Sequence, residues 1–157
     1  MSIWPELSEV LRPSHVYVPG KTPRHPEGWF DDIKSTVDPV NSPAALHQTQ
    51  AFQAGLAYLG AGYFWECHEV LEAVWMRTAD PSAERDAVQA LIQLANARLK
   101  LLMGRHRAAH RLCDIVQAHL ARCPDDMPVL GLRIDLLQSE LQATHSVVLM
   151  HYKALNG

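Results

Sequence analysis

Apolar residues recur at helical spacing over most of the chain after Pro43. Ser42 is placed as an N-cap and Pro43 as the first helical residue, so we expect a helix from here to just before Gly60. A second helix is expected over residues 62–78. The apolar positions that support the first helix are Leu46, Phe52, Leu56 and Leu59.

Three further helices are expected in the second half of the chain. One begins at Asp80-Pro81, as N-cap and first residue, and stops at Gly104. The next spans residues 105–123, and the last spans residues 135–154, where Asp135 and Gln138 form a capping box. Helices joined by such short loops pack as antiparallel neighbours, so we predict an all-α single-domain helical bundle or irregular array of about five helices.

The residues before this helical region have a different composition. Six of the ten prolines fall between Pro13 and Pro43, a density that prevents long helices. Apolar residues such as Trp29 and Phe30 could still anchor the segment on a core. We therefore predict two parts, an extended Pro-rich N-terminal arm over residues 1–43 that packs on the body, and a helical domain over residues 44–157 that is one folded unit.

Composition and charge narrow the class of protein. The 157 residues are 48% hydrophobic and 20% charged, and no apolar run reaches the roughly 20 residues of a membrane span. The start of the chain lacks the pattern of a secretory signal, and three cysteines without C-x-x-C spacing fit reduced thiols. With a net charge of −3 and scattered basic residues, we expect a cytoplasmic protein that binds neither membranes nor nucleic acids.

Residues 62–76 of the second expected helix carry most of the candidate chemistry. On a helical wheel His68 and Glu72 lie one turn apart, in the middle of an apolar arc. Glu69 lies at the edge of that arc and Glu66 points roughly the opposite way. Burial of an ionisable pair costs several kcal/mol unless its polar atoms are bonded, so a compensating partner is expected. The apolar residues of the arc are Phe64, Trp65, Leu71 and Trp75.

Three arrangements would compensate for that burial. The first is a structural network with the polar stripe of the following helix, in which Lys100 neutralises a carboxylate and the amides satisfy the remaining lone pairs. The second is a divalent metal ion, and the third is acid–base catalysis by Glu72 oriented by His68. The stripe consists of Gln89, Gln93, Asn96 and Lys100.

The metal interpretation rests on His68-Glu69-x-x-Glu72, which resembles the zincin H-E-x-x-H motif with its second histidine replaced by Glu72. His68 and Glu72 would be ligands, and His25 or His47 would supply the third. No catalytic residue is assigned; the candidates are Glu69, Glu72 and His68.

A second group of metal-type side chains is His106, His110 and Cys113, on one face of the fourth expected helix. Arg105, Arg107 and Arg111 flank it, which favours a solvated basic face over a metal site.

The sequence Tyr63-x-Trp65-Glu66-x-His68-Glu69-x-x-Glu72-x-x-Trp75 resembles the motif of the family known as domain of unknown function 309. The resemblance extends over residues 15–140, to Gln89-Ala-Leu-Ile-Gln93 with the downstream Lys100, to Tyr17-Val-Pro-Gly20 and to Pro23-Arg-His25-Pro26. Cys67 stands where alanine is usual, Ala90 replaces a glycine, and Arg24 interrupts a P-H-P triplet. The resemblance implies an all-helical fold and no known activity. The residues that it singles out for testing are Tyr17, His25, Tyr63, Glu66, His68, Glu69, Glu72, Gln93 and Lys100.

These observations favour a non-enzymatic binding module with a buried His/Glu/Lys polar cluster, in which the arm closes over His68 and Glu72 and the groove takes a small ligand or a protein partner. A homodimer is compatible with the apolar helix faces. The alternative is a metal-dependent hydrolase with His68 and Glu72 as metal ligands and Glu69 as the base. The sequence leaves open whether the arm is a fixed wrap or a lid.

Overall fold

A computed structural model describes residues 3–38 and 42–156 of the chain. Within these residues there are six α-helices and two short 3-10 helices, and no strand longer than an isolated bridge. The predicted all-α bundle is confirmed. The elements are η1 (Leu7–Glu9), α1 (Asp31–Lys34), η2 (Pro43–Gln48), α2 (Gln50–Ala61), α3 (Phe64–Trp75), α4 (Ala83–Leu102), α5 (His106–Ala121) and α6 (Ile134–Asn156).

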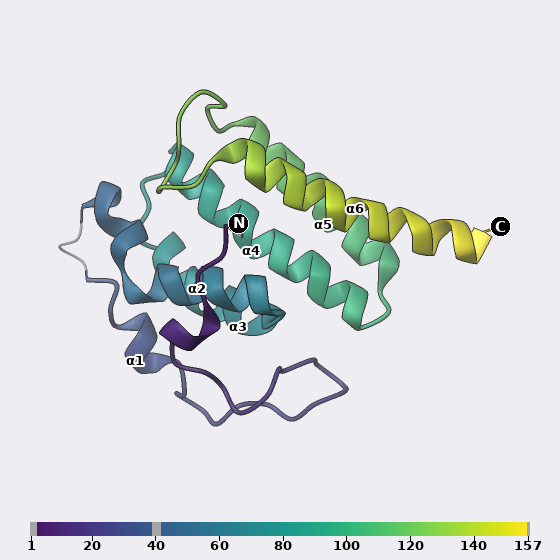
Figure 1. Cartoon of the computed structure of the whole chain (residues 1–157), viewed down its shortest axis with the longest axis horizontal. Helices are drawn as coiled ribbons and strands as arrows, with labels where there is room; N and C mark the ends of the chain where they lie inside the picture. The colour runs from purple at the N-terminus through teal and green to yellow at the C-terminus, as the bar shows by residue number, and fades with distance from the viewer. Residues whose placement is uncertain (1–2, 39–41, 157) are drawn as a thin grey trace.

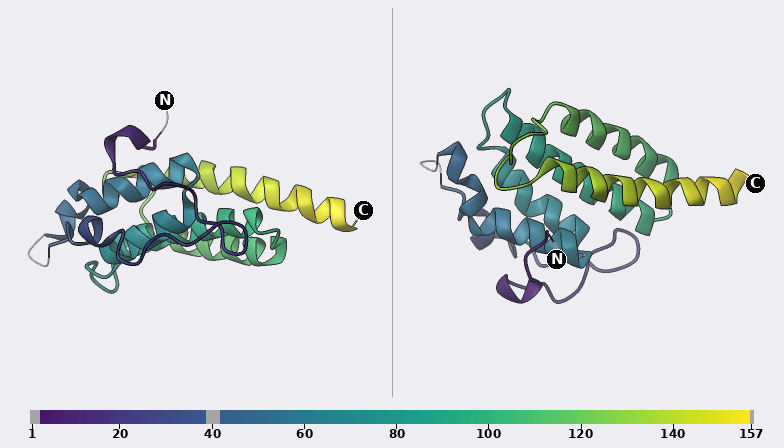
Figure 2. Two further views of the ribbon diagram at one scale, coloured as in Figure 1. Left: turned by 90° about the horizontal axis from the view of Figure 1, so that it is seen from below. Right: turned by 45° about the horizontal axis from the view of Figure 1, so that its top comes forward.

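The helices pack in the order in which they follow one another along the chain. α3 packs between α2 and α4, and α5 packs on the other side of α4. α6 lies along α5, and its C-terminal end projects beyond the other helices (Figures 1 and 2). Residues 3–38, called here the N-terminal segment, contain only η1 and α1 and run past α2 and α3.

The first long helix expected from the sequence is divided in two at Thr49. Thr49 has extended backbone, and its hydroxyl accepts a hydrogen bond from the backbone N–H of Phe52. Thr49 is therefore the true N-cap of α2, and the preceding turns form the 3-10 helix η2. Ser42, placed as the cap from sequence, makes no capping side-chain hydrogen bond.

Other helix boundaries also differ from the expectation: α6 begins at Ile134, so Asp135 lies in its first turn and is not its N-cap. α4 is capped by Ser82, whose hydroxyl accepts from the backbone N–H of Arg85, and not by Asp80. α2 continues past Gly60 and ends at Gly62, which has the left-handed backbone of a C-cap. Gly60 has another role: a Cβ at this position would lie 2.4 Å from the Cβ of Trp4, so its missing side chain lets Trp4 pack on the helix.

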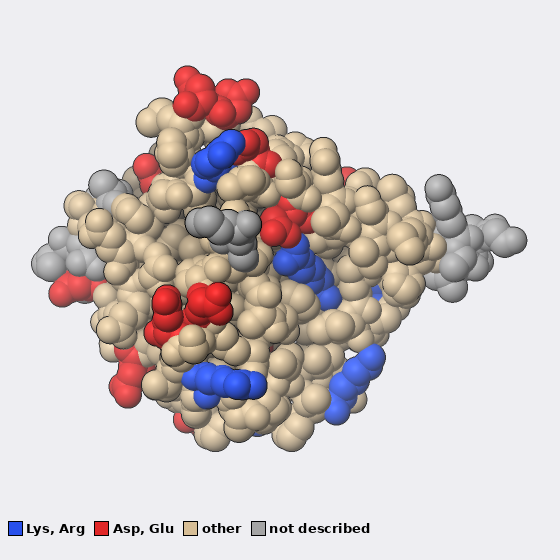
Figure 3. All heavy atoms as spheres, viewed as in Figure 1, with Lys and Arg blue, Asp and Glu red and all other residues tan. Residues whose placement is uncertain are grey.

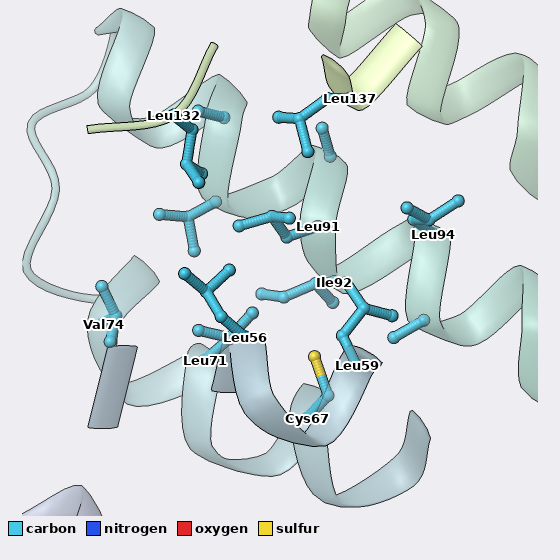
Figure 4. Packing of buried hydrophobic residues seen from close by; sticks show 14 of the residues in the cluster. Leu56, Leu59, Cys67, Leu71, Val74, Leu91, Ile92, Leu94, Leu132 and Leu137 are labelled. Atoms are coloured by element: carbon cyan, nitrogen blue, oxygen red, sulfur yellow. The ribbon is translucent and has the colours of Figure 1, made fainter. Parts of the chain in front are cut away.

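One hydrophobic core joins the helices. Figure 4 shows Leu59 of α2, Cys67 of α3 and Ile92 of α4 packed together, and Cys67 is fully buried, as expected for a packing cysteine. Phe30, Ile33 and Val37 of the N-terminal segment belong to the same cluster. This part of the predicted arm therefore shares its core with the helices.

The surface carries interspersed charges. On the face drawn in Figure 3, lysine and arginine side chains stand apart from one another among acidic and uncharged residues. No helix among the described residues is long and apolar enough to cross a membrane.

Candidate functional site

Helix α3 turns a different face to the core than the wheel indicated. Its buried core face contains Cys67, Val70, Leu71 and Val74. The large aromatic residues that were taken to mark that face, Phe64, Trp65 and Trp75, are only half-buried. The helix is therefore rotated so that small and branched apolar side chains meet α2 and α4, and the indoles lie at its margins.

This rotation buries Glu66, which the wheel had placed opposite the chemical face. Its side chain has no exposed surface. Its Oε2 atom accepts hydrogen bonds from the backbone N–H of Tyr17 at 2.8 Å and from Nε2 of His25 at 2.6 Å. The other oxygen, Oε1, is buried and has no partner among the described residues. Glu66 thus links α3 to two residues of the N-terminal segment.

The imidazole of His25 lies in an aromatic environment. Its side chain is 3% exposed. Its ring centroid lies 4.6 Å from that of His15, 5.4 Å from Phe30, and 6.1 Å from both Trp29 and Trp65. Because Nε2 donates to Glu66, Nδ1 is left for another partner, and no described residue supplies one. Within residues 3–38 and 42–156 the ring is therefore hydrogen-bonded through Nε2 alone.

Further contacts hold the N-terminal segment against the helices. The Tyr58 hydroxyl donates to the backbone carbonyl of Leu11 at 2.5 Å, and Lys21 Nζ donates to the carbonyl of Leu102 at the end of α4. Burial, and then the nearby carboxylate of Glu66, raise the pKa of Tyr58 well above its ordinary value. Tyr63, a motif residue, is buried, and its hydroxyl accepts a long hydrogen bond from Arg12.

A cleft of about 430 Å³ opens beside His25. Its walls come from residues 24–31 and Lys34 of the N-terminal segment, and from Trp65 and Glu69 of α3. Lys34 Nζ donates to Glu69 Oε1 at 2.5 Å and joins the two walls. Trp65 and Glu69 are one turn apart on α3 and so face the same side. The lining residues are Arg24, His25, Pro26, Glu27, Gly28, Trp29, Phe30, Asp31, Lys34, Trp65 and Glu69.

His68 and Glu72 do not form the buried cluster expected from the sequence. Their side chains are 33% and 55% exposed, and His68 Nε2 lies 3.5 Å from Glu72 Oε2. The physical reason is the rotation of α3, which places this pair on the side away from the core face. The pair needs no compensating network, since water solvates it.

The expected stripe on α4 is present, but it is not joined to that pair. The Gln93 amide donates to Gln89, and the Asn96 amide donates to Gln93, so the half-buried amides satisfy one another. In the described part of the chain, Lys100 has no hydrogen-bonding or ion-pair partner. The expectation that Lys100 neutralises a carboxylate is therefore wrong for the described residues.

The suggested metal ligands are not gathered at one point. His25 is bonded to Glu66, whereas His68 contacts Glu72. His47 lies elsewhere, against Gly131. No group of three or more His, Cys, Asp or Glu side chains within residues 3–38 and 42–156 is arranged to hold a metal ion. Binding of a divalent metal stays a prediction.

The histidines of the second group, His106 and His110, lie beside α6 and are partly exposed. His106 stacks on His151 with ring centroids 4.3 Å apart, and His110 lies 5.4 Å from His145. The flanking arginines Arg105, Arg107 and Arg111 are exposed. Cys113 is buried. Sequence reasoning missed these cross-helix pairs because spacing along one helix carries no information about its neighbour.

Sequence reasoning also missed the cleft. It used Trp65 as a core residue and gave Trp29, Asp31 and Lys34 no part in a site. The only local signal is the i, i+4 spacing of Trp65 and Glu69 on α3. The partners of these two residues come from a segment about thirty-five positions away, as the Lys34–Glu69 separation of 35 shows, so no pattern within the helix could indicate them.

Comparisons with known proteins support the family resemblance and add no activity. The model of the family described as "Domain of unknown function (DUF309)" matches residues 52–112, which confirms the resemblance for this part of the chain. This stretch covers α3, most of α2 and all of α4. No curated protein and no solved structure matches the chain.

Proposed function

Starting from a family match that carries no activity, we propose that this protein is a small-molecule-binding module whose site is the cleft between residues 24–34 and α3. The observation that carries the proposal is the His25 ring in the wall of that cleft. The ring is fixed at Nε2 by a fully buried carboxylate, and its Nδ1 has no partner among the described residues.

A fixed imidazole is a good anchor for a ligand. Its orientation is set before binding, so little conformational freedom is lost when a ligand group bonds to Nδ1. Nδ1 accepts a hydrogen bond when the ring is neutral and donates one when the ring is charged. Because Glu66 and the surrounding aromatic rings hold the imidazole, a ligand would meet a rigid polar group beside the indoles of Trp29 and Trp65.

The size and lining of the cleft also fit a small molecule. About 430 Å³ lies within the range of roughly 300 to 1,000 Å³ that is usual for small-ligand sites. Trp29, Phe30 and Trp65 provide apolar surface, and Arg24, Asp31 and the Lys34–Glu69 pair provide polar groups at the rim. The mixture of a few polar groups with aromatic walls is typical of ligand pockets. No comparable observation favours the metal-dependent hydrolase.

The four tryptophans allow a direct test. Trp29 and Trp65 line the cleft and serve as reporters of binding. Trp4 packs on Gly60 and Trp75 lies under Arg85, so these two tryptophans serve as internal controls. The protein is labelled with 5-fluorotryptophan, its four fluorine signals are assigned with single Trp→Phe variants, and a library of small fragments is added. We expect binding fragments to shift the Trp29 and Trp65 signals and leave the Trp4 and Trp75 signals in place.

The variant His25→Gln distinguishes binding in the cleft from non-specific binding. It removes the imidazole and keeps a polar side chain, so cleft-binding fragments should lose affinity while the helical circular dichroism signal is retained. A library in which no fragment moves the Trp29 or Trp65 signals would overturn the proposal. So would fragments that shift all four signals equally, because that pattern reports binding without a defined site.

A further inference from the structure

The charges that line the cleft indicate the chemical class of its ligand. The lining includes three carboxylates, those of Glu27, Asp31 and Glu69, but only two basic side chains, Arg24 and Lys34. Lys34 is already paired with Glu69. The remaining side chains leave an excess of negative charge at the rim, before the buried Glu66 below His25 is considered.

The aromatic side chains add a second attraction of the same sign. The Trp29 and Trp65 centroids each lie 6.1 Å from His25, and within the described residues the two indoles make no ring contact with each other. Phe30 contacts both indoles, and all three rings line the cleft. Indole faces carry negative electrostatic potential and attract ammonium groups, most strongly for tryptophan. Aromatic faces and carboxylates together disfavour an anion and favour a cation.

We propose that the cleft binds an organic cation, an alkylated ammonium group in contact with the indoles of Trp29 and Trp65 that line it, with Asp31 and Glu69 as counter-charges. This inference rests on the proposed function, since it names the class of ligand for the same cleft. The Lys34–Glu69 pair is the group that a cation would compete with, because the arriving charge could share the Glu69 carboxylate. The half-buried position of Trp65 leaves part of its surface available for the contact.

A matched pair of probes isolates the contribution of charge. Choline and 3,3-dimethylbutan-1-ol have nearly the same shape, and only choline carries a positive charge; benzoate serves as an anionic aromatic probe. Each is titrated into the fluorotryptophan-labelled protein. We expect choline to shift the Trp29 and Trp65 signals and to bind about fivefold to thirtyfold more tightly than the neutral alcohol, the range expected for a partly desolvated cation–π contact.

Variants of the cleft test the named residues. Trp65→Leu and Glu69→Gln should each weaken choline binding several-fold, whereas Glu72→Gln, on the same helix and outside the cleft, should leave it unchanged. Trp75→Leu is the corresponding control for the indole. Circular dichroism and thermal unfolding of each variant verify that the helices are retained.

The outcomes separate this inference from the proposed function. If the alcohol or benzoate shifts the two cleft signals and choline does not, the cleft binds small molecules and the cationic class is wrong. If choline binds but the Trp65→Leu and Glu69→Gln variants bind it equally well, the cation lies elsewhere and the inference is overturned. If no probe and no library fragment moves either signal, the binding function itself fails.

Discussion

Nε2 of His25 donates a hydrogen bond to Oε2 of Glu66 over 2.6 Å, between residues 41 positions apart in the chain. Both side chains are almost entirely buried. The backbone N–H of Tyr17 donates to the same oxygen. The contact joins the N-terminal segment to α3 and holds His25, which lines the candidate cleft, so this pair bears on both stability and ligand binding.

The Glu66→Ala variant should be strongly destabilised. It leaves the His25 ring and the Tyr17 N–H without their acceptor and opens a cavity beside α3. Breaking a buried polar pair from one side costs about 3 to 5 kcal/mol. Glu66→Gln keeps the shape and one acceptor oxygen, so a smaller loss of about 1 to 3 kcal/mol is expected. Chemical denaturation followed by circular dichroism measures both free energies of unfolding.

The control for this prediction is Glu72→Ala on the same helix. Its side chain is 55% exposed, and surface substitutions of this kind change stability by less than about 0.5 kcal/mol. The double variant His25→Ala, Glu66→Ala tests whether the two side chains are coupled. If its loss in free energy of unfolding equals the sum of the losses of the two single variants, the pair is not coupled, contrary to the geometry.

The His68→Ala variant should be nearly as stable as the unmodified protein. The side chain is one-third exposed, and its one ion-pair contact, with the exposed Glu72, is 3.5 Å long. Exposed pairs of this type contribute about 0 to 1 kcal/mol. The unfolding midpoint in urea measures the effect. If His68→Ala lowers this midpoint as much as Glu66→Ala does, the result contradicts the structure and supports the buried network predicted from the sequence.

The contrast between Glu66 and His68 shows what the sequence could and could not predict. Helical periodicity was sufficient to place the helices after Pro43, because each needs only one apolar stripe. It was not sufficient to orient α3, because both sides of this helix carry apolar residues. The wheel placed Trp65 and Trp75 on the buried face, whereas the residues that pack against α2 and α4 include Cys67, Val70 and Val74.

Local capping signals had a similar limit. Gly104 follows α4 with the left-handed backbone expected of a helix stop, so this signal was correct. Gly60 was also expected to end its helix, but α2 continues past it to Gly62. The missing side chain of Gly60 leaves space for Trp4 instead. The cleft itself joins the N-terminal segment to α3, and a contact across such a separation leaves no trace in the pattern of either part.

The Gly55→Ala variant should be destabilised, although alanine has the higher helix propensity by about 1 kcal/mol. Gly55 lies inside α2, and a Cβ there would be 2.4 Å from Cδ2 of Leu71 and 2.5 Å from its Cγ. α2 and α3 would have to move apart, and overpacking of this kind costs about 1 to 3 kcal/mol. The free energy of unfolding in urea measures the change.

The companion variant Leu71→Ala tests whether the cause is the Gly55 contact. The smaller side chain removes the clash, so the loss caused by Gly55→Ala should shrink when the two changes are combined. A gain in stability for Gly55→Ala alone would contradict the close approach of the two helices.

The free energy of unfolding should fall between about pH 9 and pH 11 in part because of two buried thiols. Burial raises the pKa of Cys113 and of Cys123 from 9.0 to about 11. Above pH 9 the unfolded chain releases these protons while the folded protein keeps them, so the unfolded state binds fewer protons and is favoured as the pH rises.

This contribution is fully present below pH 9 and is lost by about pH 11, at up to about 3 kcal/mol for each thiol. Other groups titrate in the same interval, so the measurement compares the unmodified protein with a Cys113→Ala and Cys123→Ala double variant, by urea denaturation from pH 8 to pH 11. The double variant should start less stable and lose less stability with rising pH. Parallel curves for the two proteins would mean that the folded thiols titrate as readily as those of the unfolded chain, which their burial opposes.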